Sequence, residues 1–198
     1  MVVTKNLNQK FALISVFDKR NLRYLCTNLK KYKYKFISTG STGNIIRGMG
    51  FKCQDISKIT KYKEMFDGRV KTLNPIIYSS LLYKREDEFH KKQFLSLKIP
   101  EIDIVIVNLY PFHKYVNKKN ANIIEMIDIG GPSLLRASGK NFKYITPIID
   151  VKDYKKLIGN LKKNDGKTDL SFRKKMAGKI YKTTSSYDKI IYNWLDDN

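Results

Sequence analysis

The most strongly apolar, β-branched run of this chain is Glu101-Ile-Asp-Ile-Val-Ile-Val107. Isoleucine and valine favour strands, and a nearly continuous apolar run is typical of a strand that is buried on both faces. A second run of this kind, Phe11-Ala-Leu-Ile-Ser-Val16, lies near the start of the chain. Strands buried on both faces belong to parallel sheets covered by helices, so the two runs predict an α/β protein.

The sequence around these runs alternates between helical and strand patterns. We expect further strands at residues 34–38, 54–59 and 142–148, and helices at residues 21–30 and 42–49 and from Asp150 onward. Asp150 and Asp153 are candidates for capping the first turn of that last helix. This order predicts a parallel sheet with helices on both faces.

From Asp169 onward the pattern is purely helical, with apolar residues such as Met176, Ile180, Tyr187 and Trp194 at intervals of three or four. A break at residues 163–167 separates this part from the rest. We therefore expect a body formed by residues 1–168 and helices in residues 169–198 that pack on the body or on a dimer partner.

Composition excludes several classes of protein. The chain has 198 residues, 42% of them hydrophobic and 12% aromatic, which does not fit a disordered chain. No apolar run approaches the roughly 20 residues of a membrane helix, and the run at residues 11–16 is too short for a signal peptide. Two cysteines and two histidines argue against a disulfide framework or a metal site. A cytoplasmic protein without a metal is expected.

The charge is strongly basic, with 39 Lys and Arg against 18 Asp and Glu, or +21. Such a surplus fits nucleic-acid binding, but it also fits a biased composition with an ordinary solvated surface. The surplus consists of 32 lysines and only seven arginines, scattered along the chain. Because arginine is the preferred residue for recognition of phosphates and bases, we do not expect nucleic-acid binding. Attraction of an anionic substrate is a secondary benefit of this charge.

Ligands of parallel α/β proteins bind beyond the carboxyl ends of the strands. One such end, Ser38-Thr-Gly-Ser-Thr42, combines hydroxyls and a glycine directly before a helix, which suits a phosphate. An ordinary capping turn explains the same residues. The segment lacks the Gly-Lys-Ser/Thr of a nucleoside triphosphate loop, so ATP is not implied.

Further polar segments carry candidate residues, although each taken alone fits a plain loop. They are Ser15-Val-Phe-Asp-Lys19, Asp67-Gly-Arg-Val-Lys-Thr-Leu-Asn-Pro75, Asn108-Leu-Tyr-Pro-Phe112 and Ile127-Asp-Ile-Gly-Gly-Pro-Ser-Leu-Leu-Arg-Ala137 with Lys140-Asn141. Together with the hydroxyl-rich segment, and in this order, they closely resemble the IMP cyclohydrolase domain at the amino-terminal end of the bifunctional purine-biosynthesis protein. The resemblance runs from about Phe11 to the end of the chain.

The resemblance implies a methylglyoxal-synthase-like fold, a three-layer α/β/α sandwich around a parallel sheet. It implies closure of 5-formamidoimidazole-4-carboxamide ribonucleotide (FAICAR) to IMP with loss of water, the last step of purine synthesis, without metal or cofactor. It also implies a homodimer and, because this chain carries no AICAR transformylase domain, a separate or fused transformylase.

The resemblance also assigns roles to single residues, as hypotheses. Lys71, Tyr110, Asp128 and Lys140 match the catalytic positions, with Asp128 as proton acceptor for the amide, Lys71 as cation for the formyl oxygen, and Tyr110 and Lys140 relaying protons or holding geometry. Ser15, Lys19, Thr39, Gly40, Ser41 and Thr42 match the 5′-phosphate site. Arg69, Thr72, Asn108, Ile129 and Gly130 match positions around the base and ribose.

Some positions depart from the family pattern. Asn74, Tyr78 and Phe142 stand where histidines are common, and Ser41 replaces a glycine. Asn74 can form hydrogen bonds but cannot transfer a proton, which puts any acid–base role of that position in doubt.

Two other activities of this fold compete with the cyclohydrolase. A lyase acting on a triose phosphate, such as methylglyoxal synthase, would share the phosphate segment but has no use for the clamp at residues 69–73. A regulatory module that binds a nucleotide without converting it is the main alternative, and the four catalytic matches disfavour it.

Overall fold

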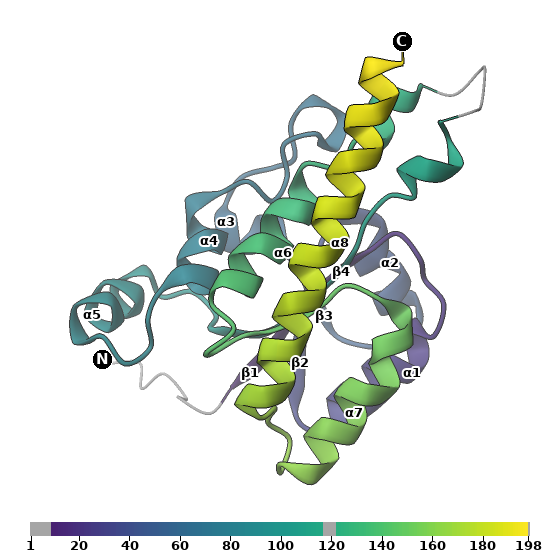
Figure 1. Cartoon of the computed structure of the whole chain (residues 1–198). Helices are drawn as coiled ribbons and strands as arrows, with labels where there is room; N and C mark the ends of the chain where they lie inside the picture. The colour runs from purple at the N-terminus through teal and green to yellow at the C-terminus, as the bar shows by residue number, and fades with distance from the viewer. Residues whose placement is uncertain (1–8, 117–121, 198) are drawn as a thin grey trace.

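The computed structural model describes residues 9–116 and 122–197. Within these residues, five parallel strands form a sheet in the order β3-β2-β1-β4-β5 (Figure 1). The strands are β1 (Lys10–Val16), β2 (Tyr34–Ser38), β3 (Cys53–Asp55), β4 (Ile102–Asn108) and β5 (Thr146–Ile148). The predicted parallel sheet is confirmed, and the two apolar runs form its neighbouring strands β1 and β4.

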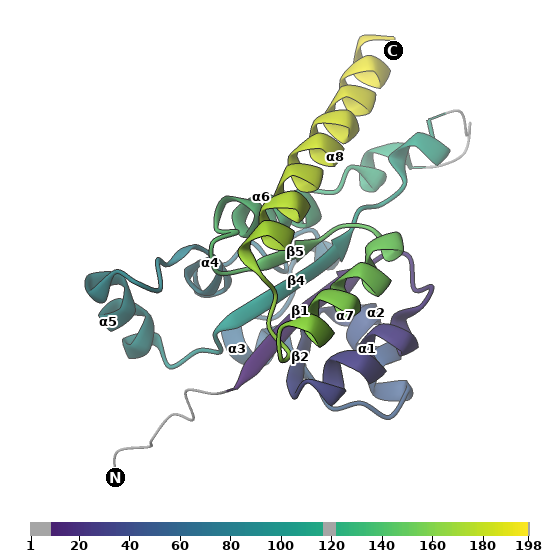
Figure 2. The same cartoon turned by 60° about the horizontal axis from the view of Figure 1, so that its bottom comes forward.

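Helices cover both faces of the sheet and produce three layers (Figure 2). One face is covered by α1 (Leu22–Lys31), α2 (Gly40–Gly48) and α7 (Tyr154–Lys163). The other face is covered by α3 (Ile56–Thr60), α4 (Pro75–Leu82), α6 (Gly130–Lys140) and α8 (Leu170–Asp196), with α5 (Glu88–Leu97) packed on α4. The three-layer α/β/α architecture expected from the sequence is therefore confirmed.

The two central strands separate two apolar cores. In β1, Ala12 and Ile14 face the core under α1 and α7, whereas Leu13 faces the core under α4 and α6. β4 pairs with β1 in parallel, but Phe11 lies opposite Ile102 while Ala12 lies opposite Ile104. Asp103 is thus an extra residue in β4, which resets the alternation of side chains beyond it.

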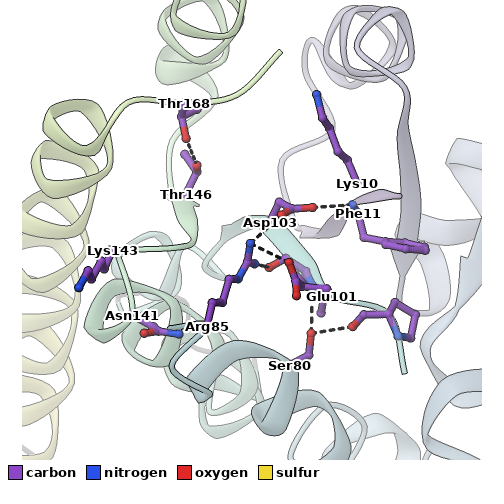
Figure 3. Close-up of polar contacts among 12 residues, drawn as sticks. Lys10, Phe11, Ser80, Arg85, Glu101, Asp103, Asn141, Lys143, Thr146 and Thr168 are labelled. Atoms are coloured by element: carbon purple, nitrogen blue, oxygen red, sulfur yellow. Dashed lines mark hydrogen bonds and ion pairs between the residues drawn. The ribbon is translucent and has the colours of Figure 1, made fainter. Parts of the chain in front are cut away.

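Asp103 is stabilised by polar contacts at the amino-terminal end of the sheet (Figure 3). Its Oδ2 accepts a hydrogen bond from the backbone N–H of Phe11 at 2.9 Å, and its Oδ1 lies 3.0 Å from Arg85 Nη1. Arg85 also pairs with Glu101 at 2.9 Å. Burial raises the pKa of Asp103, and the Arg85 guanidinium opposes that shift. These contacts fix the register of β1 and β4 far from the carboxyl ends of the strands.

The expected strand at residues 54–59 is wrong in most of its length. Strand β3 ends at Asp55, whose Oδ1 accepts hydrogen bonds from the backbone N–H of Ser57 at 2.9 Å and from its hydroxyl at 2.7 Å. This cap starts α3, because a side-chain acceptor satisfies an N–H that has no partner within the helix. The expected strand at 142–148 is likewise shorter, since a turn follows α6 and β5 begins only at Thr146.

The carboxyl-terminal part forms one continuous helix and not the several helices that we expected. Asp169 caps α8 by accepting a hydrogen bond from Phe172 N at 2.7 Å. Asp150 caps only a 3₁₀ turn, Val151–Asp153, and α7 follows it. Asp153, also expected as a cap, instead forms an ion pair with Lys179 of α8 at 2.5 Å.

Among the described residues, no helix has the length and apolar character that spanning a membrane requires.

Candidate active site

A cleft of about 800 Å³ opens at the carboxyl ends of β1, β2 and β4. In the strand order, the chain leaves β1 toward β2 and leaves β4 toward β5, so the direction of the connections reverses between β1 and β4. A parallel sheet leaves a crevice at such a switch point, because the loops that follow the two strands diverge. The volume lies in the range of small-molecule sites.

The hydroxyl-rich segment forms one wall of this cleft. The Thr39 side chain makes no capping hydrogen bond to α2, and its Oγ1 lies 3.0 Å from Ser15 Oγ at the end of β1. The N–H groups at the start of α2 therefore retain their capacity to bind an anion. Thr42 Oγ1 is 3.0 Å from Lys19 Nζ. Burial lowers the pKa of Lys19, and Asp18 offsets part of that shift.

Lys71 reaches this wall from the loop before α4. Its Nζ is 2.7 Å from Glu64 Oε2. A Cβ on Gly40 would lie 2.9 Å from the same nitrogen, and Gly40 has a φ of +31°. The positive φ favours glycine at position 40, and a side chain there would displace the end of Lys71. The ammonium of Lys71 thus lies beside the proposed phosphate segment.

Two further contacts define the rim and the floor of the cleft. Arg69 forms an exposed ion pair with Glu125, which joins the loop before α4 to the turn before Asp128. At the end of β4, Asn108 Oδ1 accepts a hydrogen bond from the backbone N–H of Asp18 at 2.8 Å. Both contacts involve residues expected around the base and ribose.

Asp128 lines the same cleft, just before the start of α6. Its Oδ1 accepts a hydrogen bond from Gly131 N at 2.8 Å. Burial raises the pKa of Asp128, while the N–H groups of Gly131 and Tyr110 lower it. A carboxyl group with a raised pKa is suited to proton transfer near neutral pH.

The glycines that follow Asp128 are required by close contacts. A Cβ on Gly130 would lie 2.7 Å from Thr72 Oγ1, and a Cβ on Gly131 would lie 2.4 Å from Asp128 Oδ2. Any side chain at either position would displace a polar group of the cleft. The Gly-Gly pair thus allows α6 to begin against the site.

Tyr110 completes the set of residues with proton-transfer chemistry. It lies in the loop after β4, 41% exposed, and its ring packs edge-on against Phe17 with centroids 5.3 Å apart. Among residues 9–116 and 122–197 its hydroxyl has no hydrogen-bond partner, and Tyr110 lines the cleft.

Of the fifteen site residues expected from the sequence, thirteen line the cleft and two do not. Gly40 lies behind the wall, against Lys71. Lys140 is the last residue of α6 and is exposed, whereas Asp128 precedes the first turn. Ten residues of helix place Lys140 about 15 Å from Gly130. The proposed chemistry below therefore assigns no step to Lys140, whose catalytic role stays a prediction. The expected residues that line the cleft are Ser15, Lys19, Thr39, Ser41, Thr42, Arg69, Lys71, Thr72, Asn108, Tyr110, Asp128, Ile129 and Gly130.

The three positions at which histidines are common in the family, Asn74, Tyr78 and Phe142, make contacts outside the cleft. Asn74 Oδ1 accepts a hydrogen bond from Ile76 N at 2.9 Å and caps α4. Burial raises the pKa of Tyr78, which packs against the apolar core. The carbonyl of Phe142 accepts a hydrogen bond from Arg173 Nε at 2.9 Å. None of the three lines the cleft.

Several residues of the site were not found from the sequence. Glu64 and Glu125 pair with the cleft cations, and Tyr187 of α8 contacts the backbone around Asp128. Acidic residues in loops and a tyrosine in an apolar helical stripe carry no local signal that would have identified them. Among the described residues, no group of three His, Cys, Asp or Glu side chains is placed to hold a metal ion.

Comparison with known proteins agrees with the motifs. The family described as "MGS-like domain" matches residues 21–133, and the family described as "AICARFT/IMPCHase bienzyme" matches residues 138–198. The chain is 42% identical over 189 residues to the bifunctional purine biosynthesis protein PurH of Magnetococcus marinus. It is 44% identical over 191 residues to the protein of the same name from Clostridium botulinum.

These alignments cover 94% of this chain but 36% and 38% of the two relatives, so the chain spans little more than a third of their length. A crystal structure of ForH superposes with a TM-score of 0.83 at 27% identity, over 94% of this chain and 99% of that chain. The first family covers more than half of the chain, and the fold and the motif order agree with it. The chain therefore belongs to the MGS-like domain family.

Proposed function

We propose that this protein is an IMP cyclohydrolase, which closes the second ring of a purine nucleotide with loss of water. The observation that carries the proposal is that Asp128 and Lys71 line one cleft together with residues of the hydroxyl-rich segment. The similarity to PurH proteins and to the bienzyme family supports the same assignment. A nucleotide held by its phosphate on the Thr39–Thr42 side would present its base to Asp128.

The proposed reaction joins two groups of one substrate. The carboxamide nitrogen attacks the formyl carbon, forming a C–N bond, and the formyl oxygen becomes a hydroxyl. One proton from the carboxamide nitrogen and one from the formamido nitrogen then leave with that oxygen as water. Holding the two groups in contact favours the reaction, because no second molecule has to be captured.

The residues of the cleft supply what a weak amide nucleophile lacks. Asp128 accepts the amide proton, and its raised pKa matches that task. Lys71 stabilises the negative charge that develops on the formyl oxygen, where one such donor is worth about 10²-fold or more in rate. Tyr110, at the open side, donates a proton to the departing oxygen.

The test is the addition of FAICAR to the purified protein while IMP formation is followed by ultraviolet absorbance. IMP should appear faster than in buffer, and Asp128→Asn should abolish most of the acceleration. The same substitution of Asp165, an exposed acid in the turn between α7 and α8 and outside the cleft, serves as the matched control and should have no effect. Formation of IMP only at the spontaneous rate contradicts the proposal.

The regulatory alternative receives support from one observation, the position of Lys140 outside the cleft. A module of this kind would bind IMP without forming it. Calorimetric titration with IMP, run beside the activity assay, therefore separates the two functions.

Further expectations accompany the proposal. Residues 1–168 form the cyclohydrolase body and residues 169–198 a helical extension, as the contacts of α8 with α6 and β5 suggest. The protein is a cytoplasmic homodimer and operates with an AICAR transformylase, either separate or fused. Exposed apolar residues of α8 such as Tyr192 and Leu195 support dimerisation, which light scattering at micromolar concentration will test.

A further inference from the structure

Helix α8 contacts both loops that carry the proposed acid–base residues. Its carboxyl-terminal half lies beside the segment that follows β4, as both overall views show (Figures 1 and 2). There the ring of Phe112, fully buried, packs edge-on against Tyr187 and Trp194 of α8, with centroids 6.4 Å and 5.7 Å apart. Phe112 is two residues from Tyr110, so these contacts fix the Tyr110 loop.

The hydroxyl of Tyr187 fixes the second loop. It accepts a hydrogen bond from the backbone N–H of Asp128 at 2.8 Å and donates one to the carbonyl of Met126 at 2.9 Å. The side chain is 8% exposed. Two backbone groups before α6 therefore find their partner on a helix 59 residues further along the chain.

We propose that Tyr187 is a positioning residue that holds the Asp128 backbone against the Tyr110 loop through its hydroxyl and its ring. The hydroxyl satisfies a donor and an acceptor of the half-buried backbone before α6, and polar groups removed from water are costly to leave unpaired. A small displacement of a catalytic group strongly lowers a rate, because reactive geometries are narrow. Loss of the hydroxyl therefore affects turnover more than substrate binding.

The turnover part of this inference rests on the proposed function, whereas the contact itself can be tested without it. In Tyr187→Phe the ring packing remains and both hydrogen bonds are lost. Hydrogen exchange of the Asp128 amide should accelerate at least about tenfold, since one 1.4 kcal/mol interaction corresponds to that factor. The kcat for IMP formation should fall about tenfold while KM changes less than about twofold.

Tyr181→Phe is the matched control. Tyr181 lies on the same helix, and its hydroxyl donates to the carbonyl of Arg136 on α6 at 3.4 Å, away from both loops. This variant should leave Asp128 exchange, kcat and KM unchanged. Thermal melting of both variants shows whether each is folded at the assay temperature.

The outcomes separate the two proposals. Unchanged Asp128 exchange in folded Tyr187→Phe overturns the contact, and accelerated exchange with an unchanged kcat overturns its catalytic effect. A wild-type protein that forms no IMP overturns the proposed function. In that case the claim that Tyr187 positions the Asp128 backbone still stands or fails on the exchange measurement.

Discussion

Lys71 and Glu64 form an ion pair, with Nζ and Oε2 2.7 Å apart, directly beside Gly40 of the proposed phosphate segment. The Glu64 carboxylate thus occupies one side of the cation that the proposed reaction needs. A substrate phosphate or a developing oxyanion must compete with it for the Lys71 ammonium. Removal of this acid should therefore improve the attraction of an anionic substrate.

Glu64→Gln is expected to lower the KM for FAICAR about 1.4- to fivefold, the range that corresponds to an exposed ion pair of roughly 0.2–1 kcal/mol. Steady-state kinetics at low ionic strength will measure it. Glu88→Gln is the control, because Glu88 pairs with Lys91 on α5 instead of with a cleft residue. A KM that rises in Glu64→Gln would mean that Glu64 supports Lys71 and does not compete for it.

Lys71→Ala and Thr42→Ala should separate chemistry from binding. Lys71 acts on charge that develops during the reaction, so its loss should lower kcat about 10²-fold while the affinity for IMP is largely kept. Thr42 contacts a phosphate that keeps its charge throughout, so its loss should mainly raise KM. If Lys71→Ala loses IMP binding and keeps kcat at saturation, Lys71 is a phosphate clamp, as its place beside Gly40 also allows.

Protonation of Asp128 should determine how the activity declines at acidic pH. As proton acceptor it must be ionised, and burial raises its pKa. Activity should therefore decline with falling pH already above the range in which ordinary aspartates titrate. Measurement of kcat/KM against pH tests this, and Asp128→Asn should lower kcat by roughly 10²- to 10⁴-fold and remove the acid limb.

The same raised pKa predicts an effect on stability. An acid with a folded-state pKa above its unfolded value stabilises the protein fully below the unfolded pKa and loses that contribution as pH rises through the folded pKa. At neutral pH the ionised Asp128 is thus unfavourable for folding. Asp128→Asn should melt at a higher temperature than the wild type at pH 7, and the difference should shrink on acidification. A lower melting temperature at pH 7 would contradict the direction of this shift.

Two Gly→Ala substitutions should have different effects, one on kcat and the other on the stability of the fold. A Cβ at Gly131 would lie 2.4 Å from Asp128 Oδ2, so Gly131→Ala should displace the carboxylate and lower kcat. Gly159 is exposed within α7 with no atom near its absent side chain, so Gly159→Ala should stabilise the fold by about 0.5–1 kcal/mol and leave kcat unchanged. Denaturant unfolding and steady-state kinetics on both variants will test the contrast.

The sequence predicted the helices and strands whose apolar side chains recur at a regular spacing. The apolar runs at β1 and β4 and the spacing of Leu22, Leu25 and Leu29 gave the right elements, because burial on two faces or on one helical face leaves a periodic pattern. The prediction of a strand at residues 54–59, after α2, was wrong in most of its length. A strand and a helix of only a few residues each are too short for a period, and the Asp55 cap decided between them.

The residues of the site likewise fall into those that a local motif identifies and those that it does not. Residues in contiguous motifs, such as Ser38 to Thr42, were found because neighbours in sequence form one wall. The position of Lys140 outside the cleft lining was not predicted, because a motif match carries no information on how far along a helix a residue lies from its first turn. Tyr187 was missed, because its partner is 59 residues away and its spacing is that of any core residue.

The extra residue in β4 is absorbed at the amino-terminal end of the sheet. Beyond Asp103, Leu13 lies opposite Val105 and Ile14 opposite Ile106, and the two members of each pair face the same core. Removal of Asp103 would leave a regular ladder in which Ile102 is followed directly by Ile104, so the side chains beyond it would keep their faces. Removal of one residue between Ile104 and Asn108 would instead shift the alternation and turn Asn108 away from the cleft that it lines. The strand can thus change in length at its amino-terminal end, whereas the spacing between its buried part and the ligand site is under functional constraint.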